Sequence, residues 1–482
     1  MRVANRRQRL NRQSPNSTRN RLYAASARQQ RWASVWAVAL LIAGCQPVTL
    51  HERSDLQFLF GGQWRAEDPV NQALPPSWLA IFDDPSLTAL VLDGLQRNFD
   101  LQAAAARVDA AREQATIAGA GRWPQLFFQP DYQRSENADG SGYAPTGSFS
   151  ALFSLNWELD VWGRIKAGRQ AALEDAEALA ADYRAARLSL AARIAQVYFE
   201  WLEAQLQTQV AAQSVEDRSV IVGLIRGRFD KGLTRGLDLR LVLTDLANAQ
   251  AQLAQAKNDL QTLGRQLQNL IARYPDDSLQ AGKHLPEPPV SLATGLPAEL
   301  LERRPDLAAA FRRLRAADSR LESAQKALLP RVSLTAAGGS VSPALTDLLD
   351  PRAAAWNFAA GLAQPLFTGD RLEAQIRLNQ AGVREAYNRY QSVALNAFRE
   401  VEQALAAESR LREQESALRE AVEQTESSRK LAVYSYQQGL IQILTLLDSY
   451  RSTLNAQSAH LRVKRQLLTN RITLLLALGG AV

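Results

Sequence analysis

Cysteine, methionine and histidine are scarce in this chain of 482 residues, and their scarcity excludes several kinds of chemistry. The sequence has one cysteine, one methionine and three histidines, namely His51, His284 and His460. A single thiol forms no disulfide within the chain, and the histidines lack the short spacing at which His and Cys ligands hold zinc. No Gly-x-Ser-x-Gly nucleophile motif is present either. We therefore expect a protein that is not an enzyme and that holds no metal ion.

The first 44 residues have the composition of an export signal. Nine arginines and no acidic residue or lysine lie in residues 1–31, and an apolar stretch runs from Trp32 to Gly44. A basic region before a short apolar core and a small-residue cleavage site is typical of a secretory signal peptide. About 13 apolar residues are too few to cross the ~30 Å hydrocarbon core as a helix. A short membrane anchor or a chance match is the alternative.

The only cysteine ends the run Leu41-Ile42-Ala43-Gly44-Cys45. A cysteine after an apolar stretch and two small residues is similar to the lipobox of bacterial lipoproteins. In a lipobox the signal is cut before the cysteine, and a diacylglycerol is attached to its sulfur. We expect this covalent lipid on Cys45 to be the only cofactor and to tether the protein to a membrane. Gln46, rather than an aspartate, follows the cysteine, and this resembles the sorting signal for the outer membrane.

The positive charge belongs to the signal rather than to the exported part of the chain. The whole chain has a net charge of +7, and removal of residues 1–44 takes away nine positive and no negative side chains, which leaves −2. Binding of nucleic acid requires a basic face. Because the exported chain is slightly acidic in total, we expect no nucleic-acid partner.

The chain repeats itself at an offset of 206–207 residues. Pro124 recurs as Pro330 and Gly163 recurs as Gly369, and such residues mark breaks between elements rather than bulk composition. A fixed internal period indicates a duplicated architecture. Each half is expected to contain a helix, two strands, a helix, a turn and a helix. The expected organisation is a lipoprotein signal peptide at 1–44, a lipidated extension at 45–85, a first repeat at 86–275, a proline-rich connector at 276–297 and a second repeat at 298–482.

Each half contains a pair of candidate membrane strands. Residues 149–161 alternate almost strictly, with Phe153 and Trp157 on one face and Glu158 and Asp160 on the other. A strand of ~9–11 residues is long enough to cross an outer membrane, with apolar residues facing lipid and polar residues facing a lumen. Half-buried strands of a soluble sandwich are the alternative. The expected strands are 125–134, 149–161, 331–341 and 354–366.

Four strands are too few for a closed barrel, which needs about eight. An open sheet edge in lipid leaves unpaired N–H and C=O groups, each at a cost of roughly several kcal/mol. The membrane interpretation therefore requires several chains: two would supply eight strands and three would supply twelve. From the residues alone both numbers stay open.

Long helical arms follow the strands in both halves. The stretches 163–274 and 369–478 are rich in Ala, Leu, Gln, Arg and Glu, which favour helix. Apolar residues at heptad-like spacing predict coiled-coil packing. A helix over residues 164–229 would reach on the order of 100 Å at ~1.5 Å per residue. One glycine interrupts each arm, Gly232 in the first and Gly439 in the second, and predicts a hairpin tip there. An ordinary antiparallel bundle without a channel is the alternative.

Several motifs are similar to those of one known family. The most specific is Arg304-Pro305-Asp306-Leu307, which is followed by Leu329-Pro330. Residues 365–371 resemble the strand-to-helix junction of that family, as do residues 157–163 in the first half. The closing run Leu476-Ala477-Leu478-Gly479-Gly480 fits as well. Over essentially all of its exported part, the chain resembles the TolC/OprM-type outer-membrane factors, in their NodT-like lipoprotein branch.

The resemblance implies a mainly α fold with a membrane β part. Three chains would form a twelve-stranded β-barrel in the outer membrane and a long coiled-coil α-barrel through the periplasm. Such a homotrimer would be the exit duct of a tripartite efflux or type I-like export system. Its expected partners are a periplasmic adaptor (membrane fusion) protein, an inner-membrane pump of the RND type, and outer-membrane lipid. The alternative is a lipid-anchored periplasmic coiled-coil scaffold without a pore.

The resemblance also implies site residues near the hairpin tips. The adaptor would contact the tips at Gly232-Leu233-Thr234 and Gly439-Leu440. A gate at the periplasmic end would use Leu444, Asp448 and Arg451, on the helix after the second tip. Three copies of Leu444 would form an apolar constriction, and Asp448 would pair with Arg451 of a neighbouring chain. The alternative for the charged residues is a surface pair worth about 0.2–0.5 kcal/mol.

Overall fold

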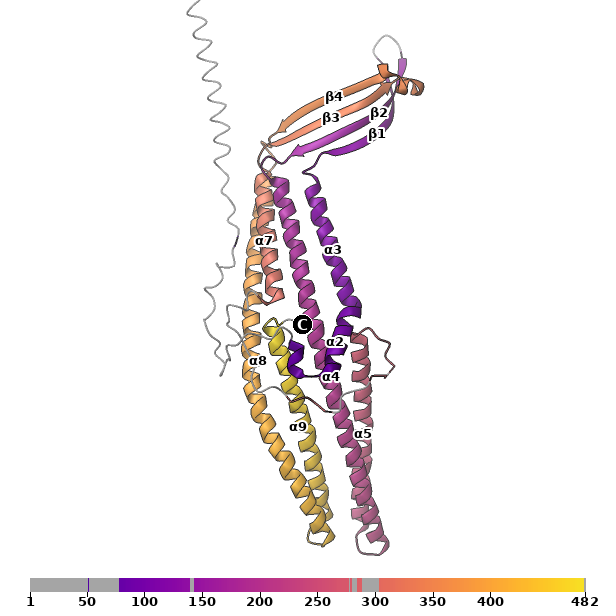
Figure 1. The fold of residues 1–482 in the computed structure, drawn as a ribbon, viewed down its shortest axis with the longest axis vertical. Helices are drawn as coiled ribbons and strands as arrows, with labels where there is room; N and C mark the ends of the chain where they lie inside the picture. The colour runs from indigo at the N-terminus through magenta and orange to yellow at the C-terminus, as the bar shows by residue number, and fades with distance from the viewer. Residues whose placement is uncertain are drawn as a thin grey trace, which may run out of the picture. The chain divides into compact units, whose positions relative to one another are not determined.

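Helices and one four-stranded sheet make up the described part of the chain (Figure 1). The computed structural model describes residues 51, 78–138, 143–276, 278–279, 284–287 and 303–480. The chain divides into two units, Met1–Thr49 and Leu50–Val482, and the description concerns the second. The predicted signal peptide and Cys45 therefore lie outside the described residues. In chain order the elements are η2 (Trp78–Phe82), α2 (Pro85–Arg97), α3 (Phe99–Ala120), β1 (Gln125–Ala138), β2 (Tyr143–Leu159), α4 (Arg164–Asp230), α5 (Gly236–Leu270), α7 (Pro305–Lys326), β3 (Arg331–Ser342), η3 (Leu345–Leu349), η4 (Pro351–Ala353), β4 (Ala354–Ala363), α8 (Arg371–Gln437) and α9 (Ile443–Ala477).

The two halves contain helices of equal length, as the internal repeat predicts. The arms α4 and α8 have 67 residues each. Their return helices α5 and α9 have 35 residues each. The helices before the strands, α3 and α7, have 22 residues each. The duplicated, mainly helical fold class is therefore confirmed. No helix in the described ranges is both long and apolar enough to cross a membrane.

One helix is predicted before the strands of the first half, whereas the structure has two, α2 and α3, separated at Asn98. The backbone of Asn98 leaves the helical region at ψ 123°, and its side chain accepts a hydrogen bond from the amide of Leu101. Its amide group donates to the carbonyl of Leu270 at 3.0 Å, where α5 ends. An asparagine that caps a new helix ends the previous one. The prediction was wrong here because the break depends on a contact 172 residues away in the sequence.

The sheet joins one strand pair from each half. Its order is β1-β2-β3-β4, and all neighbours are antiparallel. The central pairing, β2 with β3, sets Phe153 opposite Gly338 and Trp157 opposite Leu334. Among the described strands, β1 and β4 each have one unpaired edge. The sheet is therefore open on both sides within a single chain.

The second strand ends earlier than the alternation predicts. It stops at Leu159, so that Asp160 lies beyond the sheet and not on its polar face. The carboxylate of Asp160 accepts hydrogen bonds from the amides of Ile165 and Lys166 at 2.9 and 2.7 Å, in the first turn of α4. Free amides at a helix start attract a carboxylate. The role of Asp160 is therefore to accept hydrogen bonds from the free amides at the start of α4.

One helix lies at the centre of the helical part. The arm α4 contacts α2, α3, α5, α7 and α9, while α8 contacts α7 and α9. A buried cluster forms where α4 passes η2, α2 and the ends of α5 and α9, and it includes Trp78, Tyr198, Phe199 and Leu475. Because α4 contacts helices of its own half and helices of the second half, the two halves fold as one unit.

Two of the motifs that carry the family resemblance contact each other. Arg304 is buried, and its guanidinium pairs with Asp306 and with Glu400 of α8, both at 2.8 Å. It also donates to the carbonyl of Ala477 at 3.0 Å, in the last turn of α9. Gly479 has φ +70°, and a Cβ there would lie 3.0 Å from the backbone before Arg304. These contacts join the start of α7 to the end of α9.

Candidate functional site

Both predicted hairpin tips are present, and they have the same backbone geometry. Gly232 and Gly439 adopt φ +71° and +73°, a region that favours glycine. The amides of Gly232 and Leu233 donate to carbonyls three and five residues earlier, at 2.8 and 2.9 Å. Those of Gly439 and Leu440 repeat the pattern at 3.0 and 2.9 Å. This is the Schellman ending of a helix, and it reverses the chain after each 67-residue arm.

The tips present apolar side chains to their surroundings. Leu233 and Leu440 are 64% and 73% exposed. Thr234 donates its hydroxyl to the carboxylate of Asp238 at 2.7 Å and so fixes the start of α5. Both leucines are thus accessible from outside the chain. Contact of the tips with an adaptor stays a prediction.

The three residues predicted to form a gate share one exposed face of α9. Leu444, Asp448 and Arg451 are spaced by four and three residues and are all exposed. Leu446 and Leu447, on an adjoining face of the helix, are buried with residues of α4 and α5. Leu444 and Asp448 therefore lie outside the packed side of α9, and Arg451 lies at its border with α5. Pairing of Asp448 with Arg451 of a neighbour stays a prediction.

Within the chain, Arg451 contacts an acid that the sequence did not single out. Its guanidinium lies 3.5 Å from a carboxylate oxygen of Asp245 on α5. The other oxygen of Asp245 accepts a hydrogen bond at 2.7 Å from Nε of Arg218 on α4. Arg218 also donates to the carbonyl and the hydroxyl of Ser214. The side chains of Arg218 and Asp245 are only 5% and 10% exposed.

Asp245 could have been found in the sequence by its position. It lies three residues after Val242 and four before Ala249, and both of these are buried. This spacing puts a carboxylate on the apolar stripe of α5. A buried acid needs a partner, because burial of an unpaired charge is costly. The spacing therefore identifies Asp245 as a buried acid, but it does not identify its partners Arg218 and Arg451, which lie on other helices.

A second polar contact joins the two hairpins. Asp217 on α4 pairs with Arg429 on α8 at 2.8 Å. The guanidinium of Arg429 also lies over the ring of Tyr450 on α9, 5.3 Å from its centre. Burial, with the nearby charge of Asp217, raises the pKa of Tyr450 above its ordinary value. The hairpin α4–α5 is therefore tied to the hairpin α8–α9 by two charged contacts near the tips.

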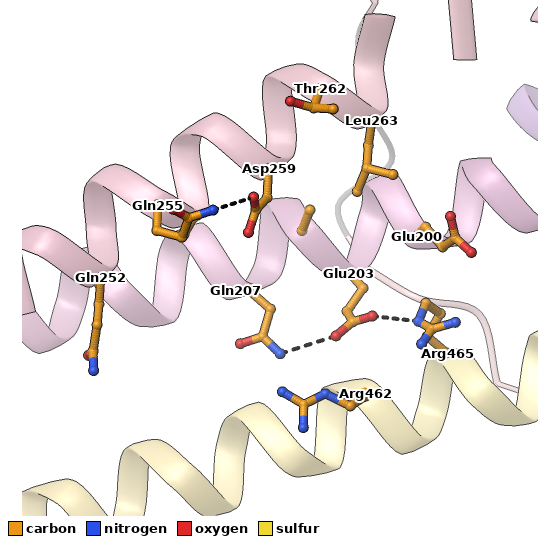
Figure 2. Close-up of a pocket in the computed structure, with 12 residues that line it drawn as sticks. Glu200, Glu203, Gln207, Gln252, Gln255, Asp259, Thr262, Leu263, Arg462 and Arg465 are labelled. Carbon is orange, nitrogen blue, oxygen red and sulfur yellow. Dashed lines mark hydrogen bonds and ion pairs between the residues drawn. The ribbon is translucent and has the colours of Figure 1, made fainter. Parts of the chain in front are cut away.

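A polar groove of about 630 Å³ lies farther from the tips, between α4, α5 and α9. Figure 2 shows that some of its side chains bind to one another. Glu203 pairs with Arg465 at 2.5 Å, and Gln255 donates to Asp259 at 2.7 Å. The hydroxyl of Thr262 donates to a backbone carbonyl at 2.9 Å. This lining offers no activated nucleophile. In the described ranges, no three or more His, Cys, Asp or Glu side chains are grouped to hold a metal ion.

Comparison with known proteins gives one consistent result. The family described as "Outer membrane efflux protein" matches residues 90–273 and 296–480, which are the two halves of the repeat. The "Pyoverdine export outer membrane protein OpmQ" of Pseudomonas putida is 32% identical over 422 residues, 85% of this chain and 89% of that protein. The "Cation efflux system protein CusC" of Escherichia coli O6:H1 is 30% identical over 460 residues, 92% of this chain and 97% of that protein. The solved open state of the MtrE outer membrane channel of Neisseria gonorrhoeae superposes with a TM-score of 0.82 and 26% identity, over 90% of this chain and 98% of that one.

Proposed function

The chain belongs to the outer membrane efflux protein family, and we propose on that premise that three copies form the exit duct of a tripartite efflux system. The duct passes substrate from an inner-membrane pump and a periplasmic adaptor to the exterior. The observation that carries this proposal is the four-stranded sheet with two unpaired edges. In lipid such edges must be paired, and pairing β1 of one chain with β4 of the next closes a barrel. Three chains supply twelve strands.

The sheet has an apolar face suited to lipid. Cross-strand partners share a face, and the register aligns Phe128, Phe153, Gly338 and Trp356 in one row across all four strands. The three aromatic side chains of this row are 58%, 55% and 84% exposed. A soluble sandwich would cover such a row with a second layer. Lipid is the environment that removes this surface from water, which favours the membrane interpretation.

Several further assignments complete the proposal. Residues 1–44 act as the signal peptide, and Cys45 carries the lipid that adds a second anchor in the outer membrane. The adaptor contacts the tips at Leu233 and Leu440, whose exposure and fixed backbone support this role. The pump is of the RND type and selects the substrate. The family is one of channel proteins, and we infer that this chain catalyses no reaction.

We also propose that Leu444, Asp448 and Arg451 close the periplasmic end of the duct. Their shared exposed face on α9 supports this role, because it is available to equivalent residues of the other chains. The related MtrE channel has been solved in an open state, so a member of this fold does open. In this chain, the guanidinium of Arg451 lies 3.5 Å from Asp245, so the predicted gate is joined to α5 by one weak ion pair.

Planar-bilayer recording tests the duct and its gate. The double substitution Asp448→Ala with Arg451→Ala is expected to raise the conductance of the purified trimer, since the charged contacts across the closed end are lost. The matched control is Arg410→Ala with Glu413→Ala, an exposed pair at the same spacing on α8, 2.8 Å apart. A folded trimer with unchanged conductance after the first substitution would contradict the gate. Absence of any current from the unsubstituted trimer would contradict the duct and favour a scaffold.

A further inference from the structure

Two ion pairs join α4 to α7, and each is called a rung below. Arg313 and Arg320 are seven residues apart on α7, and they pair with Asp182 and Asp175, which are seven residues apart on α4. A separation of seven residues returns to the same face of a helix. The four side chains are between 37% and 49% exposed, so this face is open in the single chain.

The face that carries these rungs is hollowed. A cavity of about 850 Å³ lies over α4, α7 and α8 on this side. Small residues, among them Ala310, Ala317 and Gly382, lie between the charged ones and leave the space open. Arg389 of α8 also lines the cavity. A wall of three helices that is concave on one side has the curvature expected of the inner side of a barrel.

A different face of α7 holds the beginning of the described chain. His51 donates its backbone N–H to the buried carboxylate of Asp318 at 3.1 Å, and its ring nitrogen lies 3.1 Å from the other oxygen. Arg315 donates to the carbonyl of His51 at 3.4 Å, and the ring of Tyr387 on α8 lies 5.4 Å away. Arg315 and Asp318 are not on the face of Arg313 and Arg320, because their positions along the helix differ by two or five residues rather than by three, four or seven.

The position of His51 identifies the outer side of the wall. It follows the proposed lipid attachment site, Cys45, by only six residues. A lipid in the surrounding membrane can be joined to His51 only along the outside of a closed tunnel. The face with Asp318 is then external, and the hollowed face with the charged rungs is internal.

We propose that the Asp175–Arg320 and Asp182–Arg313 rungs line the lumen of the duct and set its preference between cations and anions. The proposal rests on the proposed trimeric duct. Within the two rungs, three chains contribute equal numbers of carboxylates and guanidiniums, while Asp306, Glu385 and Arg389 also line the cavity. The positive and negative charges of the rungs therefore cancel. Removal of either the arginine or the aspartate charges leaves the opposite charges to act on the permeating ions.

The wall is thick enough to separate the effects of its two sides. A helix with its side chains is about 10–12 Å across. The screening length is about 8 Å at physiological salt. A charge on the outer face therefore acts weakly on ions in the lumen, whereas six like charges on the inner face act together.

Reversal potentials in a salt gradient test the proposal. Arg313→Gln with Arg320→Gln is expected to raise the cation-to-anion permeability ratio by a factor of about three, because the remaining carboxylates attract cations through an electrostatic interaction that salt partly screens. Asp175→Asn with Asp182→Asn is expected to lower it by a similar factor. The matched control is Arg315→Gln with Lys326→Gln, which removes two positive charges eleven residues, or about three turns, apart on the outer face of the same helix and should leave the ratio unchanged.

Labelling of single cysteines provides a second measurement, because Cys45 is the only native cysteine. In the purified trimer a small maleimide is expected to modify both Arg389→Cys and Arg315→Cys. A polyethylene glycol maleimide too bulky to enter the tunnel should modify only Arg315→Cys. Equal labelling of both by the bulky reagent would overturn the inner position of the rungs. The same conclusion would follow if the trimers conduct but the arginine and the aspartate double variants both leave the permeability ratio unchanged. It would also follow if both variants shift this ratio in the same direction. Trimers that conduct nothing at all would instead overturn the duct itself.

Discussion

Removal of the Asp245 carboxylate is the sharpest test of the contacts between the hairpins. In Asp245→Ala the guanidinium of Arg218 stays buried, with Ser214 as its remaining bonded partner among the contacts described above. Loss of one partner of a buried ion pair costs about 3–5 kcal/mol. Arg451 is 58% exposed and lies 3.5 Å from Asp245, so Arg451→Ala should cost only about 0–1 kcal/mol. The losses in unfolding free energy caused by Asp245→Ala and by Arg451→Ala should therefore differ by at least about 2 kcal/mol.

Native-state hydrogen exchange measures this difference in the assembled protein. Amides of α4 and α5 around Asp245 should lose protection in Asp245→Ala and keep most of it in Arg451→Ala. The control replaces both buried charges, as Arg218→Met with Asp245→Leu, and should recover most of the stability because no unpaired charge remains. Equal effects of Asp245→Ala and Arg451→Ala would refute the account of a buried pair. Asp245→Ala should also raise conductance, since Arg451 of α9 loses its ion pair with α5.

Four further predictions concern other parts of the chain. Gly232→Ala should destabilise its hairpin by about 1–2 kcal/mol, because φ is +71° while nothing lies within 4 Å of the added Cβ, and hydrogen exchange at the tip measures it. Arg304→Ala should lower the melting temperature of the trimer far more than removal of an exposed arginine, since it leaves the buried junction of α7, α8 and α9 without its cation. Burial, with the hydrogen bond to Asp84, raises the pKa of Tyr198 above its ordinary value of 10.0. The resulting stability is complete below pH 10 and is lost as the pH rises from there towards the folded-state pKa; in alkaline unfolding, Tyr198→Phe should therefore show a weaker pH dependence over that range. Cys45→Ser behind a cleavable secretory signal should still insert and assemble, with lower efficiency, in membrane fractionation; a wholly soluble product would mean that the lipid is the main anchor.

The sequence predicted those features that depend on local backbone chemistry. Gly163 and Gly369 adopt φ +75° and +59°, and Gly232 and Gly439 adopt φ +71° and +73°. Few residues other than glycine tolerate such angles, so each glycine marks a break that is visible without the structure. Helix composition and strand alternation are local in the same sense, which is why the element order was predicted correctly apart from the extra break at Asn98.

Features that depend on distant partners could not be read from the sequence. The break at Asn98 relies on the carbonyl of Leu270, 172 residues away in the sequence. The contact between Arg451 and Asp245 joins residues 206 apart. Helix propensity and periodicity contain no information on which helices become neighbours. The tertiary contacts around the predicted gate therefore required the structure.

Cryo-electron microscopy of the purified protein in lipid nanodiscs tests the central claim most directly. The particle should be threefold symmetric, with β1 of each chain paired with β4 of the next. The resulting twelve-stranded barrel should lie in the lipid and open into a tunnel lined by the long helices. Single chains or dimers with unpaired sheet edges outside the lipid would contradict it.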